Sequence, residues 1–183
     1  MFHLTPVRYA GEIMIQTDLS KIKYYAQKNE KQNWKFRSYL KYMDKSDADI
    51  DSFVAGISDQ IINQINCKAC ANCCKEKSPV VLKEELLSIS ERLGISREEF
   101  ENKYLEKTEE GNELIISKRP CPFLKNNECE IYDIRPENCR SYPHLLKEGF
   151  RSRLFGIIEN YSVYPIVFNT YNQLKGKCNF PAL

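Results

Sequence analysis

The cysteine pattern is the feature that most constrains this chain. Four of its eight cysteines fall within eight positions, in the segment CKACANCC at residues 67–74. A Cys-x2-Cys turn brings two sulfurs to one side of a tight loop, close enough to share one metal ion. A short, polar segment with this density of thiols is typical of a loop that folds around a metal. The other four cysteines follow at Cys121, Cys129, Cys139 and Cys178.

The spacing fits two kinds of metal centre. Cysteines in the order CxxCxxC can bind three corners of a [4Fe–4S] cluster, with the fourth ligand coming from a distant part of the chain. Four thiolates can equally close the coordination sphere of a structural zinc ion. Because Cys73 and Cys74 are adjacent, we expect their side chains to diverge, so that they serve different metals or one of them is not a ligand. The candidate metal ligands are Cys67, Cys70, Cys73, Cys74, Cys121, Cys129, Cys139 and Cys178. They could form two four-thiolate sites, or one site with spare thiols.

Two ordinary uses of cysteine fit this sequence less well. The N-terminal segment MFHLTPVRYAGEIMIQ lacks the continuous apolar stretch of a secretory signal, and no apolar run approaches the roughly 18 residues of a membrane helix. We therefore expect a cytoplasmic location without a membrane contact, where structural disulfides are rare. Buried core cysteines scatter along a chain and do not fall four within eight positions. For the isolated Cys178, the core and ligand interpretations are about equal.

The charges near the cysteines agree with ligation. Four thiolates around a divalent ion leave a net negative charge, which favours nearby cations and hydrogen-bond donors. Arg140, directly after Cys139, is the strongest candidate for such a cation. His144 is either a metal ligand, a hydrogen-bond donor to a metal ligand, or an ordinary structural histidine. The basic residues that flank the cysteines are Lys68, Lys75, Lys77, Lys118, Arg119, Arg135 and Arg140.

The sequence predicts a mostly α fold with a small β-hairpin (α+β), in two parts: a helical N-terminal extension over 1–63 and a cysteine-rich metal-binding domain over 64–183. Isoleucines and valines at helical spacing follow Asp47, the predicted cap of a helix that continues to about residue 65. We expect a hairpin in which 112–117 pairs with 129–132 around Asn126-Asn127. Further helices are predicted over 18–45 (one long or broken helix), 83–93 with Gly94 at its end, 96–104 with Ser96 as cap, 145–161 and 165–174.

Residues 18–45 carry a local charge that the whole chain does not. The complete sequence has 27 basic and 25 acidic residues, a net charge of +2, which calls for no nucleic acid and no anionic membrane as partner. This segment, however, contains eight basic and three acidic residues, and six aromatic residues are interleaved with them. The pattern suits phosphate contact with base stacking. An amphipathic helix with its aromatics in the core is the more common origin of such a pattern.

Three segments together resemble the CxxCxxCC cysteine-cluster family, also called YkgJ-like. They are CKACANCC, then CPFL at 121–124, then CEIYDIRPENCRSYP at 129–143, and the resemblance extends over about residues 67–170. The family is described as a zinc- or iron-chelating domain, and some members are labelled Fe–S-cluster oxidoreductases. The resemblance implies the seven cysteines from Cys67 to Cys139 as ligands. It also implies a framing role for Arg135, Pro136, Arg140, Tyr142 and Pro143.

This sequence departs from the family pattern at one position. Relatives often have Cys-Pro in the segment that here reads NYSVYPIVFN, with Tyr164-Pro165. Either that position is not an obligatory ligand, or Cys178 takes its place. Flagellin lysine N-methylases have a similar cysteine cluster, which implies an alternative activity with S-adenosylmethionine. This chain offers no glycine-rich cofactor loop for that activity and is short for two such domains.

We therefore expect a cytosolic metalloprotein that holds an iron–sulfur cluster or zinc through cysteine thiolates. Its role would be electron transfer with a redox or protein partner, or that of an accessory factor. A zinc-stabilised module that binds nucleic acid or protein is a further alternative, discriminated by the salt dependence of nucleic-acid binding. No nucleophile–base pair can be identified in the sequence, so an oxidoreductase activity would be implied by resemblance alone.

Overall fold

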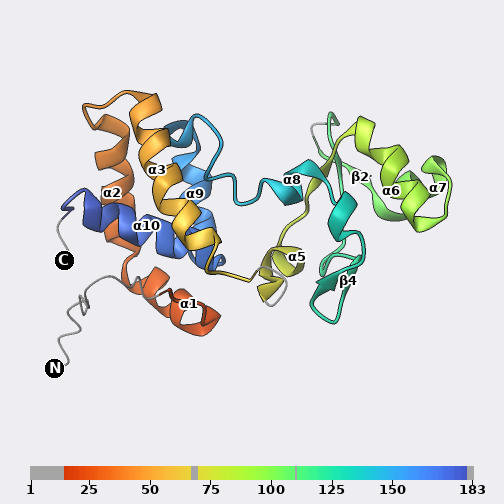
Figure 1. Cartoon of the computed structure of the whole chain (residues 1–183), viewed down its shortest axis with the longest axis horizontal. Helices are drawn as coiled ribbons and strands as arrows, with labels where there is room; N and C mark the ends of the chain where they lie inside the picture. Colours follow the sequence, from red (N-terminus) through yellow and green to blue (C-terminus); the bar gives the residue numbers. More distant parts are fainter. Residues whose placement is uncertain (1–14, 67–69, 110, 181–183) are drawn as a thin grey trace.

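The structure is a computed structural model that describes residues 15–66, 70–109 and 111–180. Its elements form two groups, at opposite ends of an elongated molecule, and two short helices lie between them (Figure 1). Helices predominate and the strands are short and antiparallel, so the fold is mostly α with a small β part, as the sequence predicts.

The first group is purely helical. It contains α1 (Leu19–Lys28), α2 (Glu30–Tyr42), α3 (Asp47–Ile62), a 3₁₀ turn (Phe150–Arg153), α9 (Leu154–Tyr161) and α10 (Pro165–Lys177). Buried side chains from both ends of the sequence make one core here, including Phe36, Ile57, Val167 and Tyr171. The core therefore joins helices from both sides of the boundary expected near residue 63, and the division of the chain there remains a prediction.

The second group combines short helices with short strands. It contains β1 (Val80–Val81), a 3₁₀ turn (Lys83–Glu85), α6 (Leu86–Leu93), α7 (Arg97–Tyr104), β2 (Glu106–Lys107), β3 (Leu114–Ile115), β4 (Leu124–Lys125), β5 (Glu128–Cys129) and a 3₁₀ turn (Tyr132–Ile134). A separate core lies inside this group, with Leu86, Ile89, Phe100 and Phe123 almost fully buried. Between the two groups lie α5 (Asn72–Glu76) and α8 (Glu137–Arg140) (Figure 1).

Several helix ends follow their local sequence signals. Gly94 ends α6 in the left-handed conformation, with φ at 68°. Ser96 begins α7 because its side chain accepts a hydrogen bond from the backbone N–H of Glu99. The cap of α3 is Ser46 and not Asp47 as expected, since the Ser46 hydroxyl accepts a hydrogen bond from the N–H of Asp49. The basic segment over 18–45 breaks into α1 and α2 at Asn29.

The expected strand pairing is wrong in one respect. Segment 112–117 does contain a strand, β3, but its partners are β1 and β2, in the order β1-β3-β2. Asn126 and Asn127 do form the turn of a hairpin, with φ at 50° and 65°, and this turn joins β4 to β5. Short loops join β2 to β3 and β4 to β5, and closing a short loop costs little entropy, whereas β1 pairs with β3 across the intervening α6 and α7.

The helix expected over 145–161 begins only at Leu154. His144 and Gly149 both have positive φ, at 62° and 78°, and turns at these residues delay the helix. The following helix, α10, begins at Pro165 as expected and continues to Lys177. In the described part of the chain, no helix combines the length and the apolar character that crossing a membrane requires.

Candidate metal centre

Two of the predicted ligands, Cys73 and Cys74, lie side by side in α5. This short helix follows Ala71, whose backbone is left-handed with φ at 46°, so the chain turns sharply into it. The two sulfur atoms are 3.9 Å apart. Adjacency therefore does not keep these sulfurs apart, contrary to the divergence expected from the sequence. Four thiolates around one zinc ion have sulfurs roughly 3.8 Å apart, so this pair has the spacing of two ligands of one ion.

The helix that carries this pair is fixed to both groups of elements. The side-chain amide of Asn72, which is 7% exposed, donates a hydrogen bond of 2.6 Å to the carbonyl of Val163, at the start of the turn between α9 and α10. From the other side, the backbone N–H of Cys121 donates to the carbonyl of Cys74 at 2.7 Å. Cysteine-bearing segments 47 residues apart in the sequence are therefore joined directly.

Three further cysteines belong to the second group or lie next to it. Cys121 and Cys129 stand on either side of the β4–β5 turn and pack against the second core. Cys139 lies in α8, and its backbone N–H donates a hydrogen bond to the carbonyl of Pro136 that closes the first turn of this helix. All three side chains are partly buried, as are Cys73 and Cys74.

The charge of Cys74 affects the pKa values of these three thiols. Burial, followed by the charges of Cys74, Cys121 and Cys129, raises the pKa of Cys139 to about 12 against the opposing effect of Arg135. The pKa of Cys121 is raised to about 11, mainly by burial. Burial also raises the pKa of Cys129, and the charge of Cys74 contributes to both shifts. Cys74 itself differs, because a hydrogen bond from Cys73, with help from the nearby cations Arg135 and Lys75, lowers its pKa to about 7 against the effect of burial.

The remaining cysteines are placed differently. Cys178 caps the C-terminal end of α10, where it lines a pocket of about 240 Å³ together with Tyr39, Met43 and Lys45. Tyr164, whose pKa is affected by the charge of Cys73, immediately precedes α10, and the length of this helix separates Cys178 from Tyr164 by roughly 20 Å. Cys70 is partly buried and its N–H donates to the carbonyl of Asn66. Cys67 and Lys68 lie outside the described residues.

Among residues 15–66, 70–109 and 111–180, no three His, Cys, Asp or Glu side chains are grouped so that they could hold one ion. The described sulfurs instead form a close pair, Cys73 and Cys74, and a wider set that interacts through charge. The assignment of individual ligands therefore remains a prediction for all eight cysteines.

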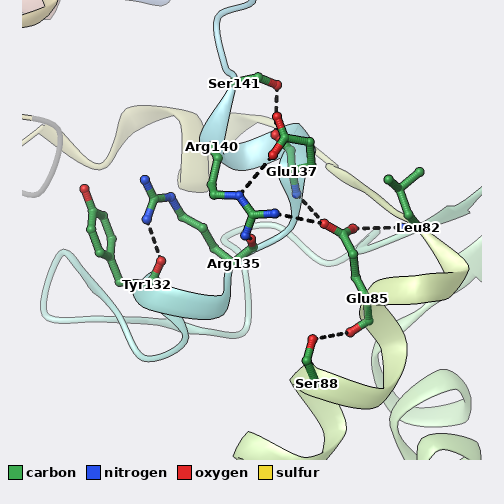
Figure 2. A network of polar contacts seen from close by, with 8 residues as sticks. All are labelled: Leu82, Glu85, Ser88, Tyr132, Arg135, Glu137, Arg140 and Ser141. Carbon is green, nitrogen blue, oxygen red and sulfur yellow. Dashed lines mark hydrogen bonds and ion pairs between the residues drawn. The ribbon is translucent and has the colours of Figure 1, made fainter.

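A polar network positions α8 and its cysteine (Figure 2). The Glu85 side chain, 12% exposed, accepts hydrogen bonds from the backbone N–H groups of Leu82 at 2.9 Å and Glu137 at 2.6 Å. Arg140 pairs with the carboxylates of Glu85 at 3.5 Å and Glu137 at 3.0 Å, and donates to the carbonyl of Arg135 at 2.6 Å. The network joins the beginning of α6 to the segment around Cys139.

The network changes the roles expected for the two arginines. Arg140, the cation that the sequence favoured beside the thiols, is engaged by two carboxylates. Arg135 is the arginine that acts on the pKa values of Cys74, Cys129 and Cys139. Its guanidinium lies over the ring of Tyr132, 3.8 Å from the ring centre, and donates to that residue's carbonyl.

His144 lies beside the cysteine segment rather than among the thiols that interact by charge. Its Nδ1 is 3.0 Å from the Ser141 hydroxyl and its ring packs edge-on against Tyr142, with the ring centres 5.5 Å apart. Burial lowers the pKa of its imidazole, and the nearby cations Lys147 and Arg153 add to the effect. These contacts fit the structural role that the sequence analysis weighed against ligation.

Sequence reasoning missed two residues that hold the site together, Asn72 and Glu85. Each acts through a partner far along the chain, 91 residues away for Asn72 and 52 for Glu85. The position of Asn72 inside the cysteine segment was the only local signal for either residue, since Glu85 is one of many acidic residues near a helix start.

Together, the fold and the gathered thiols define a cysteine-rich domain of the metal-chelating class. A comparison with protein families agrees: residues 66–180 match the model of the CxxCxxCC family, described as a "putative zinc- or iron-chelating domain". The match covers more than half of the sequence, so the chain belongs to this family and the resemblance seen in its motifs is confirmed. No solved structure matches the chain.

Proposed function

We propose that this protein holds a zinc or iron centre through thiolates at the junction of its two cores, and that the centre fixes the cores relative to one another. The observation that carries the proposal is the hydrogen bond from Cys121 to the carbonyl of Cys74, which brings the first cysteine segment against the second. The candidate ligands at this junction are Cys73, Cys74, Cys121, Cys129 and Cys139.

The chemistry of this donor set supports a thiophilic metal. Burial and mutual charge hold the pKa values of Cys121, Cys129 and Cys139 above the usual range, so the metal-free protein keeps these thiols protonated. A bound cation reverses this balance, because it stabilises thiolates and offsets their repulsion. Metal binding should therefore release protons, and affinity should increase with pH.

For the metal itself we favour an iron–sulfur cluster, on the strength of the CxxCxxC order of Cys67, Cys70 and Cys73. A cluster would supply a one-electron centre, and the protein would then exchange electrons with a redox partner in a reducing, cytoplasmic setting. Zinc would supply a closed, structural site without open positions. In both cases the residues of this chain bind the centre, shield it partly from water and hold its charge next to Arg135.

Metal analysis of the protein purified without air tests the proposal. We expect stoichiometric zinc or iron, and for a cluster also inorganic sulfide and a brown, reducible chromophore. Replacement by serine at Cys74 or Cys121 should lower the bound metal severalfold, whereas Cys178→Ser should retain it because Cys178 lies at the far end of α10. Protein without stoichiometric zinc or iron would refute the proposal, and colourless zinc protein would refute the iron–sulfur part.

One observation favours a second function, binding of single-stranded nucleic acid by α1 and α2. The aromatic residues of these helices do not all enter the core, as the simpler interpretation expected, because Tyr24 is 59% exposed and Tyr42 80%. Trp34 and Tyr39 are also exposed. Stacking aromatics among cations are the usual elements of a sequence-tolerant nucleic-acid surface. The exposed lysines on these two helices are Lys21, Lys23, Lys28, Lys31, Lys35 and Lys41.

Fluorescence anisotropy with a single-stranded RNA tests this second function. If all six lysines contact phosphates, the affinity should fall about 300-fold between 50 and 200 mM salt. The double variant Lys31→Gln/Lys35→Gln should bind more weakly and with a smaller salt dependence, whereas Lys103→Gln, an exposed lysine on α7, should bind like the unaltered protein. Absence of binding at 50 mM salt would exclude this function.

A further inference from the structure

Two tyrosines beside the cysteine pair, Tyr142 and Tyr164, have buried hydroxyl groups. Tyr164 is only 4% exposed, and among the described residues the hydroxyls of Tyr142 and Tyr164 have no possible hydrogen-bond partner except each other. The two rings pack edge to face with their centres 4.9 Å apart, so both hydroxyls belong to one small region. A contact between the two hydroxyls would satisfy one of their protons at most. Burying an unpaired donor is unfavourable, and each such group in a native protein needs an explanation.

The region in question adjoins Cys73. Asn72, the neighbour of Cys73, donates its hydrogen bond to Val163, the neighbour of Tyr164. Tyr142 and Cys73 both pack against the first core. Tyr142 also follows Cys139 by three residues in the sequence. In agreement with this placement, the charge of Cys73 contributes to raising the pKa of both tyrosines, after the larger effect of burial.

We propose that the Tyr142–Tyr164 pair donates a hydrogen bond to the Cys73 sulfur when that sulfur is a metal-bound thiolate, and thereby sets the affinity of the centre. The inference rests on the proposed function, because it needs a metal at the junction. A metal-bound thiolate keeps negative charge on its sulfur and accepts hydrogen bonds from nearby donors. The hydroxyl proton of the pair that has no acceptor among the described residues thus gains one on loading. The tyrosines are positioning residues and not ligands.

Phenylalanine variants separate this role from simple packing, since they keep the ring and remove only the hydroxyl. In the metal-free protein, Tyr164→Phe and Tyr142→Phe each remove a buried hydroxyl whose only possible partner among the described residues is the other tyrosine, so the urea midpoint should stay nearly the same or increase. In the loaded protein the same variants lose a hydrogen bond to a ligand, so zinc affinity should decrease by 10- to 100-fold. The two expected effects have opposite signs, which a purely structural role does not produce.

Tyr171→Phe is the matched control. Tyr171 is 1% exposed in the first core, and its hydroxyl already donates to the carbonyl of Asn33 at 3.0 Å. Its removal should lower the urea midpoint of the metal-free protein and leave zinc affinity unchanged. Cobalt(II) loading gives an independent spectroscopic measurement. The sulfur-to-cobalt charge-transfer band should move to longer wavelength in the two site variants and stay in place in the control, because a thiolate without its hydrogen bond is more electron-rich.

The experiment is made on the full chain, by competition between the protein and a chromophoric zinc chelator. Equal zinc affinity in the unaltered protein and both site variants would overturn the tyrosine proposal and leave the metal centre intact. A lower urea midpoint in the metal-free site variants would overturn it as well, since both hydroxyl protons would then have acceptors in the apo protein. An unaltered protein that binds neither zinc nor iron would refute the proposed function itself.

Discussion

The ammonium group of Lys175 is buried in the first core, and the residue is only 7% exposed. It donates a hydrogen bond to the side-chain carbonyl of Asn33 and lies 5.3 Å and 5.2 Å from the ring centres of Tyr161 and Tyr171. Burial lowers its pKa from 10.5 to about 8. Between these two values the unfolded chain binds more protons than the folded protein, so this residue makes the free energy of unfolding rise with pH.

Replacing Lys175 by methionine should remove that rise. The free energy of unfolding of the unaltered protein, minus that of Lys175→Met, should increase by about 2 kcal/mol between pH 7 and pH 10. Urea unfolding at both pH values measures the difference, and the contribution of the thiols cancels because both proteins share them. Lys177→Met, which alters an exposed lysine on the same helix, should show a constant difference. A constant difference for Lys175→Met would mean that the folded protein does not disfavour this charge.

Single residues also show where sequence reasoning succeeds. Gly94, Ser96 and the Asn126-Asn127 turn act through neighbours within a few positions, so their local chemistry was sufficient to predict them. Tyr164 and Glu85 act through contacts with segments more than 20 residues away, and nothing next to them in the sequence marks those contacts. The cysteines lie between these cases, since spacing identified them as a set but could not tell that Cys178 stands at the far end of a helix.

At the scale of elements, α6 and α8 are linked through one carboxylate. Glu85→Ala would leave two donors without their acceptor, the backbone N–H groups of Leu82 and Glu137, and would remove one of the two carboxylates that pair with Arg140. We expect the free energy of unfolding to fall by about 2–3 kcal/mol. Because α8 carries Cys139, we also expect metal affinity to fall about tenfold. Urea unfolding and chelator competition measure the two effects.

The control for this variant is another acidic residue in the same group of elements. Glu101 pairs with Arg97 at 2.7 Å on the surface of α7, where the arginine side chain is 54% exposed. Glu101→Ala should therefore change stability by less than about 0.5 kcal/mol and leave metal binding as it is. If Glu85→Ala were as mild as this control, the network of Figure 2 would not be what holds α8 in place.

Pairing of elements was the least predictable part of the fold. The sequence located β3 and the turn before β5 but joined them to one another, because β-propensity marks a strand without naming its partner. The same holds for the helices: the apolar spacing of α3 was evident, whereas its packing against α10, more than 100 residues later, was not. Such long-range pairing is decided by the fit of complete surfaces, which a single sequence does not display.

At the scale of the whole molecule, α5 and α8, which carry Cys73, Cys74 and Cys139, lie between two separate hydrophobic cores (Figure 1). Each core has its own buried aromatic and aliphatic side chains and should remain folded without metal. The short helix α5 is held by a few hydrogen bonds, from Asn72 to Val163 on one side and from Cys121 to Cys74 and Arg119 to Glu76 on the other. One bond of this kind contributes about 1 kcal/mol, which is little to hold two cores at a fixed angle.

A metal that crosslinks these segments would add much more, so its removal should loosen the junction before it unfolds either core. Hydrogen exchange measured with and without chelator should show at least tenfold faster exchange over residues 70–76, 121–129 and 137–140, with little change in α3 and α10. Small-angle scattering should show a larger radius of gyration. Cys121→Ser should reproduce this behaviour with metal present, and Cys178→Ser should not. Uniform loss of protection in both cores would instead make the metal a condition for folding of the entire chain, and unchanged exchange at the junction would mean that the metal does not join the two cores.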